Sequence, residues 1–146
     1  MKFEYNEFVD RPISIEDCEL SDLETFCVLF NKKVQFRNCT INNVRIEGGA
    51  FYQGLVFENC RFTQNFQMLY TGHNRSDATG RFSNCRFEVF ADFTDCWYEG
   101  PVEFSDCEFL HGSHLLGNVG KPYVVNFDPF PQPTIVNVQG DLRLET

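Results

Sequence analysis

The side chains best able to do chemistry lie between residues 88 and 115. Cys107, His111 and His114 have a spacing that a zinc site could use, because thiolate and imidazole are common zinc ligands. No fourth ligand is apparent in the sequence, and Cys107 also belongs to a repeated motif that places it inside the fold. We therefore expect no metal and no cofactor.

A pair of carboxylates, Asp92 and Asp95, is the other candidate for catalysis. Two such groups hydrolyse glycosidic bonds when a groove holds the sugar chain and burial raises the pKa of one of them. The sequence has no glycine-rich phosphate loop and no activated nucleophile. It therefore predicts a protein that is not an enzyme, with a small carbohydrate-active enzyme as the weakest of three hypotheses.

Composition limits the partners and the compartment. The chain has 146 residues, 21 acidic and 12 basic, and a net charge of −9. Binding of nucleic acid requires clustered Lys and Arg, so direct contact with DNA or RNA is not expected. No segment has the ~18 consecutive apolar residues of a membrane helix, and none has the pattern of a secretion signal. Seven cysteines at wide spacings favour reduced thiols in the cytoplasm.

An internal repeat predicts the elements that position these residues. Six segments share the pattern apolar, any residue, Asn or Asp, Cys, any residue, apolar, and they are 15–20, 36–41, 57–62, 82–87, 93–98 and 104–109. Most of their cysteines are 21 to 25 residues apart, and the short runs between them are rich in strand-forming residues. A strand repeat of this length predicts an all-β parallel β-solenoid of about five coils of 21–22 residues. Five coils give only ~25 Å of stack, which is short for a polysaccharide groove.

Each position of the motif has a physical role in such a coil. The two apolar residues point inward on either side of a bend, so stacked coils build ladders of Phe on Phe. Asn or Asp tolerates the left-handed backbone of a corner and can bond from coil to coil. The cysteine is small enough to lie inside the corner, where a buried thiol is inert. The sequence thus predicts a structural ladder of Cys18, Cys39, Cys60, Cys85, Cys96 and Cys107.

Pairs of apolar residues five apart, with a small residue two positions before the second, resemble the pentapeptide-repeat proteins. Ile15, Cys18 and Leu20 are one example, and the resemblance covers about residues 15–115. The resemblance implies that the chain winds as a single-stranded, right-handed, roughly square parallel β-helix. It also implies a kind of function, because some members of that family look like DNA and occupy topoisomerase grooves.

The whole chain, 1–146, is expected to be one domain with its coils over 15–120. Residues 1–14 are expected to form an N-terminal cap, and 121–146 a C-terminal cap or final strand, because the end coils of a solenoid need covers. A terminal strand with an open edge would permit a homodimer.

Two segments allow more than one interpretation. Ser21 to Glu24 have the pattern of a helix capping box, so a short helix over 21–30 is an alternative to a strand. The longest step between motif cysteines has about four extra residues, which predicts an insertion loop that projects from the stack and includes His73, Asn74 and Arg75. Loops on a rigid scaffold often carry function, so this one is a candidate site.

Most of the net charge is local, because seven acids and no Lys or Arg lie between Phe87 and Gly120. The sequence predicts that these acids face outward around an exposed Trp97, as a surface of Glu88, Asp92, Asp95, Trp97, Glu99, Glu103, Asp106 and Glu108. This face either only keeps the protein soluble or recognises a partner. Our leading hypothesis is a non-enzymatic protein-protein interaction module, of inhibitor or immunity type, for a basic or nucleic-acid-binding protein. The alternative is a structural β-helix that assembles end to end.

Overall fold

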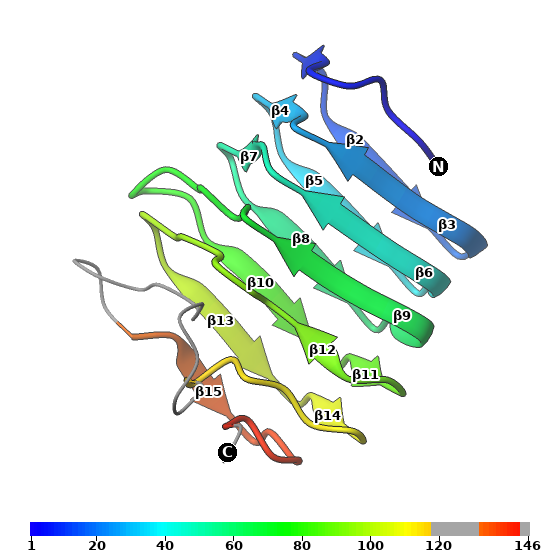
Figure 1. Ribbon diagram of the computed structural model, residues 1–146, viewed down its shortest axis with the longest axis vertical. Helices are drawn as coiled ribbons and strands as arrows, with labels where there is room; N and C mark the ends of the chain where they lie inside the picture. Colours follow the sequence, from blue (N-terminus) through cyan, green and yellow to red (C-terminus); the bar gives the residue numbers. More distant parts are fainter. Residues whose placement is uncertain (118–131, 144–146) are drawn as a thin grey trace.

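The strands stack as the successive rungs of a solenoid of about five turns (Figure 1). This computed structural model describes residues 1–117 and 132–143. Every pairing between its strands is parallel, and each strand pairs with strands of the neighbouring coils. The described residues contain no helix, and so none that is long and apolar enough to cross a membrane. The prediction of an all-β parallel solenoid is confirmed.

Three parallel sheets form the walls of the solenoid. The first contains β1 (Phe8–Val9), β4 (Leu29–Phe30) and β7 (Ala50–Phe51). The second contains β2 (Ile13–Glu16), β5 (Val34–Arg37), β8 (Leu55–Glu58), β10 (Gly80–Ser83), β13 (Val102–Ser105) and β15 (Thr134–Val136). The third contains β3 (Glu19–Phe26), β6 (Thr40–Glu47), β9 (Arg61–Leu69), β11 (Arg86–Phe87) and β14 (Glu108–Phe109), with β12 (Ala91–Asp92) also paired to β9.

Residues 21–30 adopt the strand alternative. Leu23 and Thr25 on β3 are buried, while Asp22, Glu24 and Phe26 are more exposed, which is the two-residue period of a strand. β3 pairs along its length with β6 of the next coil. The capping-box pattern does not produce a helix here, because pairing with β6 and burial of Leu23 and Thr25 favour the extended backbone.

Strands lie within both segments that are predicted to cap the stack. In 1–14, β1 pairs with β4, and Ile13 begins β2. Before it, Lys2 bridges to Glu24 and Phe3 packs edge-on against Phe30, with ring centroids 5.0 Å apart. At the other end β15 adds a strand to β13. The remainder of the predicted C-terminal cap, 118–131 and 144–146, lies outside the described residues.

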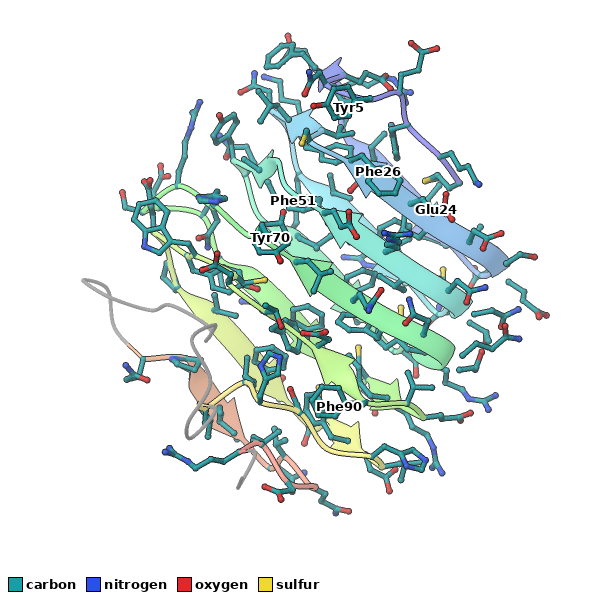
Figure 2. All side chains as sticks on the ribbon, in the orientation of Figure 1. Tyr5, Glu24, Phe26, Phe51, Tyr70 and Phe90 are labelled. Carbon is teal, nitrogen blue, oxygen red and sulfur yellow. The ribbon has the colours of Figure 1, made fainter. Side chains whose placement is uncertain are left out.

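The apolar residues of the motif form continuous ladders inside the solenoid. Phe57 stacks on Phe36 at 5.1 Å, and Phe82 stacks between Phe57 at 5.3 Å and Phe104 at 4.6 Å. A second ladder runs through Phe62, Phe87 and Phe109. In Figure 2, Phe51 belongs to this interior, whereas Tyr5 and Tyr70 belong to the exposed surface. The predicted Phe ladders are therefore present.

All six corner residues that precede a motif cysteine have a left-handed backbone. Their φ angles lie between 50° and 54°, at Asp17, Asn38, Asn59, Asn84, Asp95 and Asp106. Asn and Asp adopt this conformation more readily than other residues with a side chain, because a short polar group can bond locally. The pattern at these positions therefore reflects backbone geometry, as the sequence predicts.

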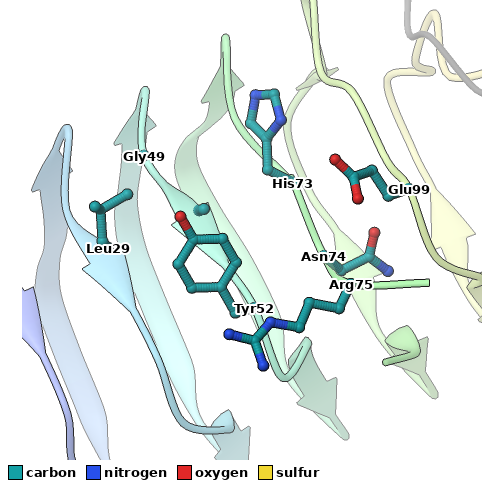
Figure 3. Close-up of a pocket in the computed structure, with 8 residues that line it drawn as sticks. Leu29, Gly49, Tyr52, His73, Asn74, Arg75 and Glu99 are labelled. Carbon is teal, nitrogen blue, oxygen red and sulfur yellow. The ribbon is translucent and has the colours of Figure 1, made fainter. Parts of the chain in front are cut away.

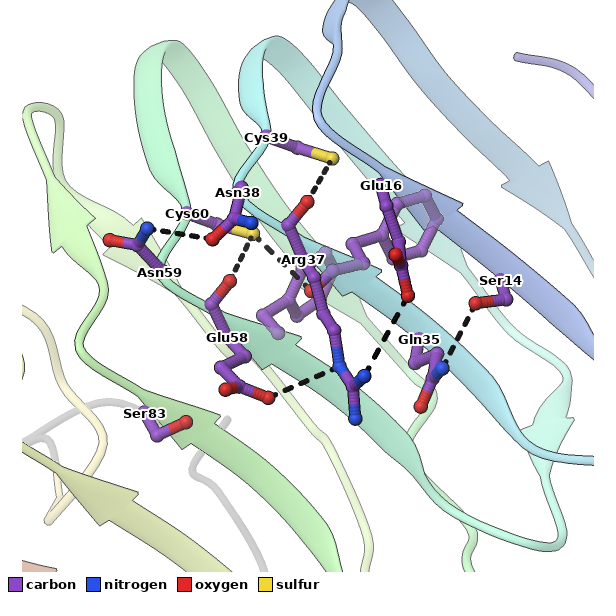
Figure 4. A network of polar contacts seen from close by, with 12 residues as sticks. Ser14, Glu16, Gln35, Arg37, Asn38, Cys39, Glu58, Asn59, Cys60 and Ser83 are labelled. Atoms are coloured by element: carbon purple, nitrogen blue, oxygen red, sulfur yellow. Dashed lines mark hydrogen bonds and ion pairs between the residues drawn. The ribbon is translucent and has the colours of Figure 1, made fainter.

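The corner amides also bond from coil to coil, as Figure 4 shows for Asn59 and Asn38. Asn38 donates from Nδ2 to Asp17 at 2.8 Å, Asn59 donates to Asn38 at 2.8 Å, and Asn84 donates to Asn59 at 3.1 Å. The next corner is Asp106, which accepts from Asn137 at 2.6 Å. An ionised carboxylate has no proton to donate to Asn84, so the ladder is interrupted between these two coils.

Asp106→Asn is expected to raise the free energy of unfolding by about 1 kcal/mol. Asn84 and Asp106 occupy the same place in successive coils, because Ser83 pairs with Ser105. An amide at 106 can donate to Asn84 and still accept from Asn137. Urea unfolding of the variant measures the change, and Asp95→Asn, at a corner outside this column, is the matched control. Equal effects of the two substitutions would assign the gain to loss of negative charge instead.

Candidate functional site

Three acids of the predicted acidic surface are ion-paired to arginines, and each has an arginine partner in a neighbouring coil. The pairs are Arg61 and Arg86 with Glu88 at 2.7 and 3.4 Å, Arg81 with Glu103 at 2.9 Å, and Arg86 with Glu108 at 3.1 Å. These bridges are solvent-exposed and contribute little to stability, but they neutralise charge locally. The stretch is therefore acidic along the chain, whereas in space three of its seven acids lie beside an arginine.

The aspartates of this surface occupy different environments. Asp95 and Asp106 are exposed corner residues, and Asp106 is bound by Asn137. Asp92 is half-buried and lies against His114, whose Nε2 is 2.8 Å from Asp92 Oδ1. The structure therefore does not gather the three aspartates into one site.

Burial and hydrogen bonds act in opposite directions on Asp92. Desolvation is the largest single effect and raises its pKa, but hydrogen bonds from His114 and from the hydroxyl and amide of Thr94 together outweigh it. The pKa of Asp92 is therefore lowered. A glycosidase of the kind considered above needs a carboxyl whose pKa is raised, and Asp92 does not meet that requirement.

Asp92 has a lower pKa in the folded protein than in the unfolded chain, so its ionised form stabilises the fold above the unfolded pKa. This contribution is lost as pH falls through the folded pKa. Asp92→Asn is thus expected to reduce the loss of stability between pH 6 and about pH 3. Chemical unfolding at both pH values measures the difference, with Asp95→Asn as control. If Asp92→Asn leaves the pH dependence unchanged, the network does not couple to folding.

The residues with zinc-like spacing are not assembled. His111 is exposed, His114 is buried against Asp92, and Cys107 donates from Sγ to the backbone oxygens of Phe82 and Ser105. Within the ranges that the structure describes, no group of three or more His, Cys, Asp or Glu side chains is arranged to hold a metal ion.

All seven cysteines are free thiols. Cys39, Cys60, Cys85, Cys96 and Cys107 are buried, whereas Cys18, in the first coil, is half-buried. Burial is the main cause that raises the pKa of Cys39 to about 12, and it does the same for Cys96. These two thiols are protonated at neutral pH, which agrees with the structural role that the sequence predicts for them.

The insertion loop and part of the acidic surface meet at a cleft on the side of the stack (Figure 3). The cleft has a volume of about 520 Å³ and is lined by Leu29, Gly49, Ala50, Tyr52, His73, Asn74, Arg75 and Glu99. His73, Asn74 and Arg75 come from the predicted loop and Glu99 from the predicted surface. Tyr52 is not among the predicted site residues. It precedes His73 by one coil of 21 residues, so the coil period could have predicted that the two lie side by side.

Hydrogen bonds hold the loop against the stack, so it does not project freely as predicted. Asn74 is 2% exposed, and its Nδ2 donates to the backbone oxygens of Ala78 at 2.7 Å and Pro101 at 3.0 Å. Its Oδ1 accepts from the amide of Gly100 at 2.9 Å. A Cβ on Gly100 would lie 2.1 Å from the oxygen of Arg75, so only glycine permits this approach. The loop is therefore a fixed wall of the cleft.

Aromatic and charged groups lie side by side around the cleft. The Arg75 guanidinium lies 5.2 Å from the centre of the Tyr52 ring, and the rings of His73 and Trp97 are 5.2 Å apart. Burial lowers the pKa of His73 more than the nearby carboxylates Glu99 and Asp95 raise it. His73 is therefore mainly neutral near pH 7.

Two carboxylates close to this cleft differ from the glutamates described above. Among the residues that the structure describes, neither Asp95 nor Glu99 forms an ion pair with a basic side chain. Both act electrostatically on His73, which places them near the cleft wall. This part of the predicted surface therefore keeps its negative charge.

These features define a single-chain parallel β-helix with a polar and aromatic cleft on one side. Residues 4–127 match the family model described as right-handed beta helix region. The match covers most of the chain, which therefore belongs to the right-handed β-helix family, and the resemblance to pentapeptide-repeat proteins is compatible with this assignment. Comparisons with curated proteins and with solved structures give no match.

Proposed function

We propose that the protein is a non-enzymatic binding module whose cleft receives a basic segment of a partner protein. The observation that carries the proposal is the group of Tyr52, Arg75 and Trp97 beside Asp95 and Glu99, two carboxylates with no basic partner in the part of the chain that the structure describes. Trp, Tyr and Arg are the residues most often found at the energetic centre of protein interfaces. A rigid cleft of such residues binds without first paying the entropy of ordering a loop.

The charge pattern favours a Lys or Arg side chain as the group that enters. Asp95 and Glu99 are available to pair with it, whereas Glu88, Glu103 and Glu108 already have arginine partners. The binding surface that we propose is therefore the part of the predicted acidic surface beside the cleft, and not the whole of it. An inhibitor or immunity-type role in the cytoplasm would use such a surface to block a basic site on its target.

Trp97 is the single tryptophan of the chain and gives a direct test. Titration with a short Lys- and Arg-containing peptide at low salt is expected to change its fluorescence, and Glu99→Gln to weaken binding about 10-fold, or ~1.4 kcal/mol. Glu108→Gln is the matched control, because Arg86 already neutralises that glutamate. Equal losses for both variants would indicate attraction by overall charge alone, and binding unaffected by Glu99→Gln would overturn the proposal.

End-to-end assembly is the second candidate, because the second sheet ends at β2 with no strand beyond it among the described residues. The outward backbone groups of an edge strand can pair with a strand of another copy. Sedimentation over a concentration series tests this. Species that grow with concentration would support assembly, a fixed dimer would indicate pairing of two edges, and a monomer throughout would exclude both.

A further inference from the structure

Five thiols of successive coils interact with their neighbours and form a column inside one corner of the solenoid. The column begins with Cys18, whose Sγ is 3.5 Å from Sγ of Cys39 in the next coil. The two cysteines are in register, because Glu16 pairs with Arg37 just before them and Glu19 pairs with Thr40 just after. Neighbouring strands lie about 4.8 Å apart, which is within the range of Cα separations that a disulfide spans.

Accessibility distinguishes this pair from the other members of the column. Cys39, Cys60, Cys85 and Cys107 are each no more than 2% exposed, so oxidants in solution do not reach them. Cys18 is half-buried, because it lies in the first coil and β2 has no further strand beside it within the described ranges. Within the column, oxidation therefore begins at Cys18, and the thiol next to Cys18 is Cys39.

We propose that Cys18 and Cys39 form a peroxide-sensitive dithiol that closes to a disulfide and fastens the first coil to the second. The thiolate of Cys18 attacks one oxygen of the peroxide and the O–O bond breaks, which gives a sulfenic acid on Cys18 and releases hydroxide. The sulfur of Cys39 then attacks Cys18, the S–O bond breaks, and the departing hydroxide takes the proton of Cys39 and leaves as water. In total, two thiols and one hydrogen peroxide give one disulfide and two waters.

The environment of Cys39 decides the order of these steps. Its Sγ donates to the oxygen of Arg37 at 3.1 Å, and burial raises the pKa of this thiol, so Cys39 is protonated and is not the first nucleophile. Cys39 acts second, when a sulfenic acid lies in contact with it. The bond would close a loop of 21 residues and restrain the N-terminal end of the stack.

The test exposes the purified protein, in a Cys27→Ser background, to hydrogen peroxide and maps its tryptic peptides by mass spectrometry. The background is needed because Cys18 and Cys27 lie on the same tryptic peptide. We expect a loss of two hydrogens, a link between Cys18 and Cys39 that dithiothreitol reverses, and an unfolding temperature that is higher in the oxidised form. Cys39→Ala is expected to stop at a sulfenic acid on Cys18 that dimedone traps, and Cys18→Ser to leave Cys39 reduced.

The interior of the column supplies the internal control. Cys60 and Cys85 also occupy one corner in successive coils, but both are buried, so they are expected to remain reduced over the time in which Cys18 reacts. A disulfide between two copies through Cys18, equal oxidation of the interior pairs, or persistent sulfenic acid with Cys39 intact would each overturn the proposal. None of these outcomes depends on whether the cleft binds a basic peptide.

Discussion

Phe82→Ala is expected to lower the free energy of unfolding by about 3–5 kcal/mol, the cost of removing a large aromatic side chain from a packed core. Phe82 is 2% exposed and stacks between Phe57 and Phe104 of the two adjacent coils. It also meets the edges of Phe66 and Phe93 from the opposite side of the interior. Its loss therefore removes contacts with both neighbouring coils and across the solenoid at once.

The cavity left by Phe82→Ala is expected to remain largely open, because β10 is held by parallel pairing to β8 and β13 and cannot move inward alone. Urea unfolding followed by the fluorescence of Trp97 measures the change. Phe8→Ala is the matched control, since Phe8 is 58% exposed and its truncation should cost less than ~0.5 kcal/mol. A loss below ~1 kcal/mol for Phe82→Ala would indicate that the coils repack.

The fold could be predicted because the motif records the conformation of one corner, which is a local property. Asn and Asp precede the cysteines where the backbone is left-handed, and the φ angles of all six corners agree. Inward Phe residues one coil apart must stack, because parallel strands bring equivalent positions into register. Neither inference requires knowledge of any distant contact.

The charge distribution could not be predicted from one short stretch of sequence, because most of the ion pairs form between coils. Glu103 and Glu108 have their partners, Arg81 and Arg86, 22 residues earlier, outside the stretch that lacks basic residues. Arg61 is 27 residues before Glu88, since the insertion lies between them. The coil period predicts the first two pairs, whereas the third depends on how the insertion folds.

Asn74→Ala is expected to have the largest effect on the cleft. It removes three hydrogen bonds, to Ala78, Pro101 and Gly100, from a side chain that is almost fully buried. A buried polar group left without a partner costs about 1–3 kcal/mol, so stability should fall by at least that amount. Asn74→Asp retains the acceptor for Gly100 but loses both donors and buries a charge, so it should be no more stable than Asn74→Ala.

The position of the loop explains why binding should fail along with stability. Asn74 joins the two arms of the insertion to the coil that follows. Glu99 immediately precedes Gly100, whose amide donates to Asn74. Without Asn74, the wall that carries His73 and Arg75 is no longer fixed to the wall that carries Glu99. Binding of the basic peptide should therefore weaken at least 10-fold, measured on protein that is still folded. Hydrogen exchange at the Gly100 amide should accelerate in parallel, whereas Arg75→Ala, which alters only an exposed side chain, should leave that exchange unchanged. Normal peptide binding by a folded Asn74→Ala variant would show that the loop does not form the site.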